Sequence, residues 1–357
     1  MNKSILGPAL LFILGLVSVP LCAGHLRAPS VPLVACDPYF SIWSSADRLT
    51  DADTVHWTGK PHRLASLITI DDTRYRVTGS QPSEVPPLPQ KSVTVLPTRT
   101  IYTFEGGGIR LSLTFMTPAL PDDMELLSRP VTYVTWSVQT IDDKTHDVNI
   151  DFTASGELAV NNPSEQVDGV MEELQGLTAI KIGSTNQAVL AKSGDDIRID
   201  WGYLYVAAPT GIDGTTASLI APEGDLPVAG EAVAASITFD AIKATDQPTT
   251  RWLILAYDDL YSIQYMKQNL RPYWRRDGWE AADLLQASAK EYETLTTRCR
   301  AFDNVLMADL TRAGGKNYAA LCALAFRQCF AAGKFVADDN GQPLQFCKEN
   351  HLSLIHI

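Results

Sequence analysis

The sequence predicts a large antiparallel β-sandwich followed by the beginning of a helical domain. Two patterns indicate this fold class. From Lys91 to about Leu255, apolar and polar residues alternate in short runs that are separated by turn residues. After Asp258 the apolar residues recur at intervals of three and four, which is typical of helices. The change of period places the sandwich first in the chain and the helices after it.

The run Ile109–Phe115 shows the alternation most clearly, because its odd-numbered residues are apolar and its even-numbered residues are polar. A period of two places the apolar side chains on one face of a strand. Similar runs occur at 134–138, 148–152 and 235–239, and Gly106–Gly108 is typical of a turn. Because no helical stretch separates these runs, we expect two packed antiparallel sheets.

The first helical spacing after the sandwich occurs at Leu260–Met266. A longer helix is predicted from Trp279 to about Met307, where apolar residues repeat at three and four over the whole stretch. We interpret residues 256–310 as a helical segment that connects the sandwich, 25–255, to the next domain.

A helical hairpin is expected to begin at Thr311. Its helix Lys316–Ala332 ends before Gly333, and a strand-like stretch, Pro343–Cys347, follows. Apolar residues cover most of the circumference of this helix, so several neighbouring helices are needed to bury it. These apolar residues are Tyr318, Leu321, Cys322, Ala325, Phe326, Cys329 and Phe330. Since the neighbours are missing, we expect residues 311–350 to be the first part of a truncated domain.

The two ends of the chain have their own interpretations. Residues 1–24 are typical of a secretory signal peptide, with Lys3, an apolar run interrupted by glycine and proline, and small residues at the cleavage site. Cys22 leaves a lipid anchor open, although Leu21 precedes it where a small residue is expected. We therefore expect a periplasmic or secreted protein. Residues 351–357 resemble translated adapter read-through, and the alternative is a genuine short apolar C-terminus.

Composition excludes several classes of partner and cofactor. The formal net charge of −12 disfavours binding to nucleic acid, whose phosphates need basic side chains, and no stretch after the signal peptide is apolar enough to span a membrane. Five cysteines follow Cys22, too few for a disulfide framework. Cys322 and Cys329 are roughly 10 Å apart on a helix, too far to pair, and are interpreted as inert core residues. We expect no metal or other cofactor, and the composition predicts no oligomeric state.

Candidate catalytic residues lie near the end of the chain. Glu349 is a candidate general base, and the ammonium of Lys348 is placed to adjust its pKa. Asp339 is a second carboxylate candidate, although Asp338–Gly341 is also explained as a tight turn. A solvated loop or a salt bridge is the alternative for Lys348 and Glu349. The sequence contains no serine-hydrolase elbow, zinc-protease motif or P-loop, so a carboxylate-activated water is the expected chemistry.

Candidate substrate-binding residues form a dense aromatic and polar block near the N-terminus: Asp37, Trp43, His56 and Trp57. The imidazole of His56 is expected to titrate near neutral pH, and the two indole rings are suited to walling a pocket. The alternative is structural packing at a strand or domain boundary, with Asp37 setting a turn before Pro38.

Several of these segments resemble the glutaminase A family. The N-terminal block 26–44, the segments His56–Lys60 and Tyr257–Ile263, and the blocks 313–328 and 346–350 match that family in order, so the resemblance covers Arg27 to Asn350. It implies an exported protein in which a β-sandwich precedes an α/α toroid of six helical hairpins. It also implies hydrolysis of the glutamine side-chain amide to glutamate and ammonia. His351 and Leu352 depart from the family pattern, which supports truncation.

Two other functions remain open from the sequence. A β-sandwich followed by an α/α toroid is also an architecture of glycoside hydrolases, in which two carboxylates would do the work. A non-catalytic module that binds a glycan or a peptide is the third interpretation. The expected partner is therefore a small-molecule or glycan substrate.

Overall fold

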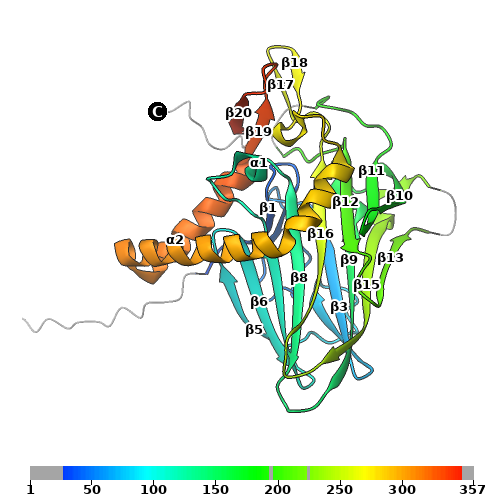
Figure 1. The fold of residues 1–357 in the computed structure, drawn as a ribbon. Helices are drawn as coiled ribbons and strands as arrows, with labels where there is room; N and C mark the ends of the chain where they lie inside the picture. Colours follow the sequence, from blue (N-terminus) through cyan, green and yellow to red (C-terminus); the bar gives the residue numbers. More distant parts are fainter. Residues whose placement is uncertain (1–26, 193–195, 223–225, 348–357) are drawn as a thin grey trace, which may run out of the picture.

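The computed structural model describes residues 27–192, 196–222 and 226–347. Two antiparallel β-sheets pack face to face, and the long helix α2 (Ala281–Ala332) lies across the outer face of the larger sheet (Figure 1). The predicted large antiparallel sandwich is confirmed. Residues 1–24 and 348–357, on which the signal peptide and two catalytic candidates were predicted, lie outside the described residues.

The larger sheet has nine strands in the order β14-β10-β11-β12-β16-β8-β7-β6-β5. Every pair of neighbours in it is antiparallel. Its strands are β5 (Gln90–Val95), β6 (Arg99–Gly106), β7 (Ile109–Met116), β8 (Val131–Thr140), β10 (Gln166–Leu174), β11 (Leu177–Ser184), β12 (Tyr203–Pro209), β14 (Val228–Ala229) and β16 (Thr249–Asp258).

The smaller sheet has five strands in the order β13-β15-β9-β3-β4, and three two-stranded hairpins lie beside the sandwich. The five strands are β3 (Leu64–Ile70), β4 (Thr73–Thr78), β9 (His146–Ser155), β13 (Thr215–Ile220) and β15 (Ala234–Ala244). The hairpins are β1 (Val31–Ala35) with β2 (Ser41–Ser44), β17 (Ile263–Tyr265) with β18 (Gln268–Leu270), and β19 (Gly333–Ala337) with β20 (Pro343–Cys347). Short helices are α1 (Met124–Leu127), η1 (Gly156–Ala159), η2 (Gly230–Ala232) and η3 (Tyr273–Arg275).

The core lies between the two sheets, where the alternating residues of the strands meet. Trp136 on β8 is fully buried, and its ring centre lies 5.5 Å from that of Phe152 and 5.9 Å from that of Phe239 on the opposing sheet. Its indole nitrogen donates a 3.2 Å hydrogen bond to Ser66 Oγ, so the one polar atom of the ring is satisfied. The alternation predicted over Ile109–Phe115 is confirmed, because the odd-numbered residues are all buried.

Helix α2 buries part of the outer face of the nine-stranded sheet. Its residues Leu284, Leu285 and Leu295 pack on apolar side chains of β8, β12 and β16. Tyr292 stacks on Trp252 with ring centres 4.1 Å apart, and Tyr133 donates a 2.7 Å hydrogen bond to the Ser288 carbonyl oxygen. Part of the larger sheet is therefore covered on both faces.

Gly315 divides α2 into two helical segments that run back along each other. Its φ of 83° and ψ of 177° are open to glycine and costly for other residues, and Figure 1 shows α2 as two segments with a reversal between them. Phe302 and Phe326, on opposite sides of the bend, lie 5.7 Å apart between ring centres. The two helices predicted from the sequence are confirmed, although the hairpin begins at Ala281 rather than at Thr311.

The helix-like spacing at Leu260–Met266 gave a wrong prediction. The chain forms the β17–β18 hairpin there, because Leu260, Met266 and Lys267 take positive φ values of 56°, 49° and 69° that a helix does not contain. After Ala332 the chain continues as the β19–β20 hairpin. The sequence predicted β20, as the strand-like stretch Pro343–Cys347, but it did not predict β19.

Among the described residues, helix 316–332 lacks the neighbours that would bury its apolar faces, as expected, but the interpretation of Cys322 and Cys329 as core residues is wrong. Its buried residues are Ala319, Ala323, Leu324, Arg327, Ala331 and Ala332. The predicted apolar residues lie on the other faces: Leu321 is 54% exposed, Cys329 is exposed, and Cys322 is half-buried. The described residues therefore leave an apolar helix face uncovered. They contain no helix long and apolar enough to cross a membrane.

At the end of the sandwich, His146 joins two loops through ion pairs. Its Nδ1 lies 2.5 Å from Asp71 Oδ2 and its Nε2 lies 2.9 Å from Asp142 Oδ1. Because a carboxylate only accepts hydrogen bonds, both ring nitrogens must donate, which requires the protonated imidazolium. Hydrogen bonds to Asp71 and then to Asp142 raise the pKa of His146 above its ordinary value.

We predict that the contribution of His146 to stability depends on pH. Its folded-state pKa is raised, so the contribution is fully present below pH about 6.5 and is lost as pH rises through the folded-state pKa. Urea unfolding of wild type and His146→Ala is expected to differ more at pH 5.5 than at pH 8.5. An equal difference at the two pH values would contradict the imidazolium assignment.

Candidate functional site

The candidate site centres on a tight turn between β1 and β2. Asp37 Oδ1 accepts hydrogen bonds from the backbone N–H groups of Tyr39 (2.8 Å) and Phe40 (3.2 Å), which is the turn chemistry expected of an aspartate before proline. The carboxylate is 2% exposed. Such a buried carboxylate needs a cationic partner.

That partner is Lys334, the second residue of β19. Its ammonium contacts Asp37 Oδ2 and lies 2.7 Å from Asp259 Oδ2, just after β16. All three side chains are buried. We call this group the buried ion triad. Burial alone would lower the pKa of Lys334, but Asp259 and Asp37 raise it above its ordinary value, so the lysine stays charged.

A second buried ion pair lies next to the triad. Arg275 Nε donates a 3.1 Å hydrogen bond to Asp258 Oδ1, and its Nη1 lies 2.7 Å from Glu280 Oε2. Asp258 Oδ1 also accepts the backbone N–H of Leu260 at 3.0 Å. The two neighbouring carboxylates at the end of β16 are thus both engaged in ion pairs, and the second pair fixes the start of α2.

His56 and Trp57 pack against the same turn. His56 Nε2 is 3.0 Å from the Pro38 carbonyl oxygen, and Trp57 Nε1 donates to that oxygen at 2.8 Å. Burial lowers the pKa of His56 to about 3, so its imidazole is neutral at physiological pH. The expectation that His56 titrates near neutrality is therefore wrong, because the ring has no access to water.

Trp43, on β2, packs against the returning segment of α2. It forms a small apolar cluster with Ala35, Leu324 and Ala331, at whose edge Trp57 lies. The structure therefore brings together Asp37, Trp43, His56 and Trp57 around one turn. Because the first three are buried against protein, the geometry favours the packing interpretation of this block.

The catalytic candidates lie elsewhere. Asp339 is exposed at the tip of the β19–β20 hairpin, beside Asp338, whose Oδ1 accepts the N–H groups of Asn340 and Gln342 at 2.8 Å each. The tight turn predicted there is present. Lys348 and Glu349 lie outside the described residues, directly after Cys347, which pairs with Gly333 beside the triad.

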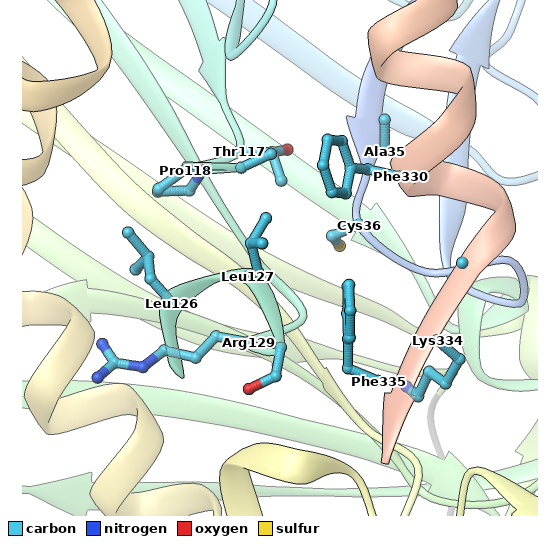
Figure 2. A pocket seen from close by; sticks show the side chains of 13 residues that line it. Ala35, Cys36, Thr117, Pro118, Leu126, Leu127, Arg129, Phe330, Lys334 and Phe335 are labelled. Atoms are coloured by element: carbon cyan, nitrogen blue, oxygen red, sulfur yellow. The ribbon is translucent and has the colours of Figure 1, made fainter. Parts of the chain in front are cut away.

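A narrow pocket adjoins the triad. Figure 2 shows the Phe335 ring pointing toward Cys36, with Lys334 beside it and with Leu127 and Arg129 on the other side. The space between them is about 10 Å³, enough for about one water molecule. Burial, and then Asp37, raises the pKa of the Cys36 thiol to about 12, so this sulfur is not an activated nucleophile. The pocket is too small for an amino acid.

No three His, Cys, Asp or Glu side chains in the described ranges are grouped closely enough to hold a metal ion. Sequence reasoning missed Lys334, Asp259 and Arg275. Lys334 carried one weak signal of burial. Alternate residues of a strand lie on one face, so in the strand 333–337 Lys334 shares a face with the apolar Val336.

Comparison with family models identifies the family of this chain. The family model described as a domain of unknown function, DUF5127, matches residues 98–309, which is more than half of the chain. The chain belongs to the DUF5127 family. A second domain of unknown function, DUF4964, matches residues 20–89.

Among curated proteins, the DUF5127 chain is 23% identical to Glutaminase A of Aspergillus oryzae over 366 residues. The match covers 90% of this chain but only 51% of that protein, so the chain spans about half the length of its relative. This distant similarity extends across both the sandwich and α2.

Solved structures share its fold only loosely. A bacterial glucoamylase complexed with acarbose aligns with 85% of the chain and 40% of its own length, at a TM-score of 0.45 and 11% identity. An inverting mannosidase of family GH92 from Bacteroides thetaiotaomicron aligns with 88% of the chain and 38% of its own length, at a TM-score of 0.39 and 11% identity. Neither likeness identifies a reaction.

We predict that the buried ion triad contributes strongly to stability. Replacing Lys334 by Met leaves two buried carboxylates without their cation, which is expected to lower the unfolding free energy by about 3–5 kcal/mol. The control is Lys243→Met, whose side chain is 63% exposed and whose ion pair with Asp147 is expected to contribute less than about 1 kcal/mol. Urea unfolding measures both. Equal losses for the two variants would contradict the role of the triad.

Proposed function

We propose that this chain is the N-terminal part of an exported hydrolase of the glutaminase A type. In the complete protein the reaction is hydrolysis of the glutamine side-chain amide to glutamate and ammonia. The observation that carries the proposal is the distant similarity to Glutaminase A over 90% of the chain. That match includes about half of the relative, so the activity is proposed for the longer protein.

The helical part of the structure fits this proposal. The two segments of α2 form one antiparallel helical hairpin beside the sandwich, as the first hairpin of a toroid would. The returning segment exposes Leu321 and Tyr318, and Val305 on the outgoing segment is 64% exposed. Exposed apolar side chains gathered on one helical hairpin are typical of a surface that meets further protein. Further helical hairpins of the complete domain would bury them.

Glu349 remains the proposed general base, with Lys348 as its neighbouring cation and Asp339 as a second carboxylate. Supporting this placement, Cys347 pairs with Gly333, so the chain leaves β20 beside the buried ion triad. The triad holds β19, with which β20 pairs, and the Tyr265 ring of the β17–β18 hairpin lies 5.4 Å from the Phe346 ring of β20.

We predict that the protein encoded by the complete gene releases ammonia from L-glutamine, whereas the 357-residue chain alone does not. Glu349→Gln in the complete protein is expected to lower kcat by about 10²–10⁴, the usual contribution of a general base. Glu84→Gln, on an exposed loop of the sandwich, is the matched control and should leave kcat unchanged.

Parallel assays of ammonia and of reducing sugar separate this reaction from glycoside hydrolysis. Absence of ammonia above background from the complete protein would overturn the glutaminase proposal. Full activity of Glu349→Gln would overturn only the assignment of the base.

A further inference from the structure

The outer face of the nine-stranded sheet is covered only in part. Cross-strand register places Val170 of β10, Lys181 of β11 and Tyr205 of β12 in one row on this face. Tyr205 is buried beneath α2, whereas Val170, at the far end of the row, is 50% exposed. The β10–β12 end of the sheet therefore presents an uncovered surface.

This uncovered surface contains a hollow of about 380 Å³. Strands β10, β11 and β12 line it together with the loop that follows β11. The volume falls within the range of small-ligand sites, about 300–1,000 Å³. It is much larger than the one-water pocket beside Lys334.

Polar and aromatic groups stand at defined positions around the hollow. Asp168, Gly183 and Tyr203 form one cross-strand row, and Lys181 lies two residues along β11, about 7 Å away at the usual strand rise. Gly183 makes room for the Tyr203 ring, because a side chain at this position would collide with that ring. The Asp168 carboxylate, an acceptor, and the Lys181 ammonium, a donor, thus stand on the same face of the sheet beside the Tyr203 ring.

The walls of the hollow are held in place by interactions within the protein. Lys181 Nζ lies 4.1 Å from the centre of the Tyr203 ring and 3.6 Å from Glu172 Oε1. In the loop, Gln187 Nε2 donates to the carbonyl oxygens of Ser184 (2.8 Å) and Gly202 (3.0 Å), and its Oε1 accepts the Gly202 N–H at 2.7 Å. A pre-formed site loses little conformational entropy when it binds a ligand.

The charge of the hollow selects the class of ligand. Asp168 and Glu172 outnumber Lys181 around it, and the chain as a whole carries a net charge of −12. Acidic sugars and phosphates are repelled from such a surface. A neutral, hydroxyl-rich ligand satisfies both a carboxylate and an ammonium without bringing charge.

We propose that this hollow binds a neutral carbohydrate. The Tyr203 ring provides the apolar surface for a sugar ring, Asp168 accepts hydrogen bonds from its hydroxyl groups, and Lys181 donates to them. The site lies on the sandwich, and binding there needs no catalytic group. The proposal is therefore independent of the glutaminase reaction.

The first test is affinity electrophoresis of the 357-residue chain in gels containing laminarin, yeast mannan, xyloglucan or soluble starch, with polygalacturonate as the acidic comparison. Retardation by at least one of the four neutral polysaccharides, with none by polygalacturonate, is the expected result. Failure of all four to retard the chain, or retardation by polygalacturonate alone, would overturn the proposal.

The second test locates the site by substitution, using calorimetric titration with oligosaccharides of the polymer that binds. Asp168→Ala and Tyr203→Ala are each expected to weaken binding by about tenfold or more, the loss typical of a hydrogen bond to a charged group. Glu84→Ala and Tyr265→Ala, an exposed carboxylate and an exposed ring outside the hollow, are the matched controls. Asp168 is exposed, so its variant keeps the fold even if Tyr203→Ala does not. Unchanged affinity in Asp168→Ala would exclude this hollow as the site.

Discussion

The buried contact of the Lys334 ammonium with Asp37 and Asp259 is the interaction on which the C-terminal half of the structure depends. Lys334 and Asp37 are 297 residues apart in the sequence, so their contact closes the chain on itself. Removing a lysine and two carboxylates from water costs several kcal/mol for each ion. Their mutual attraction offsets that cost only in one geometry. The triad therefore fixes the relative positions of the β1–β2 turn, the end of β16 and the start of β19.

A second buried ionic contact joins α2 to the sandwich. Asp303 accepts hydrogen bonds from the Thr98 N–H at 2.9 Å and from Arg99 Nε at 2.7 Å, and its carboxylate is fully buried. Burial raises the pKa of Asp303, and the Arg99 guanidinium partly offsets that increase. Helix α2 is thus attached to the sandwich through its apolar face near Leu285 and through a buried carboxylate further along. The helical hairpin is held as a rigid extension of the sandwich.

Local patterns predicted those parts of the fold that local physics determines. The period of two at Ile109–Phe115 identified a half-buried strand, and the spacing in α2 identified both helical segments. The β17–β18 hairpin was missed because its turn depends on positive φ values at Met266 and Lys267, residues that do not usually indicate such a turn. The exposure of Cys329 was missed because burial depends on which neighbours are present.

The site residues show the same division between local and long-range effects. The turn at Asp37 and the tight turn around Asp339 were predictable from neighbouring residues. The partner of Asp37 was not, because no local signal connects position 37 to position 334. His56 was wrongly expected to titrate near neutral pH. Its burial against Pro38 and Trp57 arises only in the tertiary structure, so the local sequence carries no sign of it. The dense block of polar and aromatic residues gathers around one turn in the structure. Whether such a block binds a ligand or packs against protein depends on its structural surroundings.

The most direct measurement is the coupling energy between Asp37 and Lys334 in a double-mutant cycle. Unfolding free energies of wild type, Asp37→Asn, Lys334→Met and the double variant are obtained from urea denaturation followed by tryptophan fluorescence. If the triad joins the two halves of the chain, the double variant loses less stability than the sum of the single variants, with a coupling of about 2–3 kcal/mol. Additivity within about 0.5 kcal/mol would show that the two residues act independently, and would contradict this account of the fold.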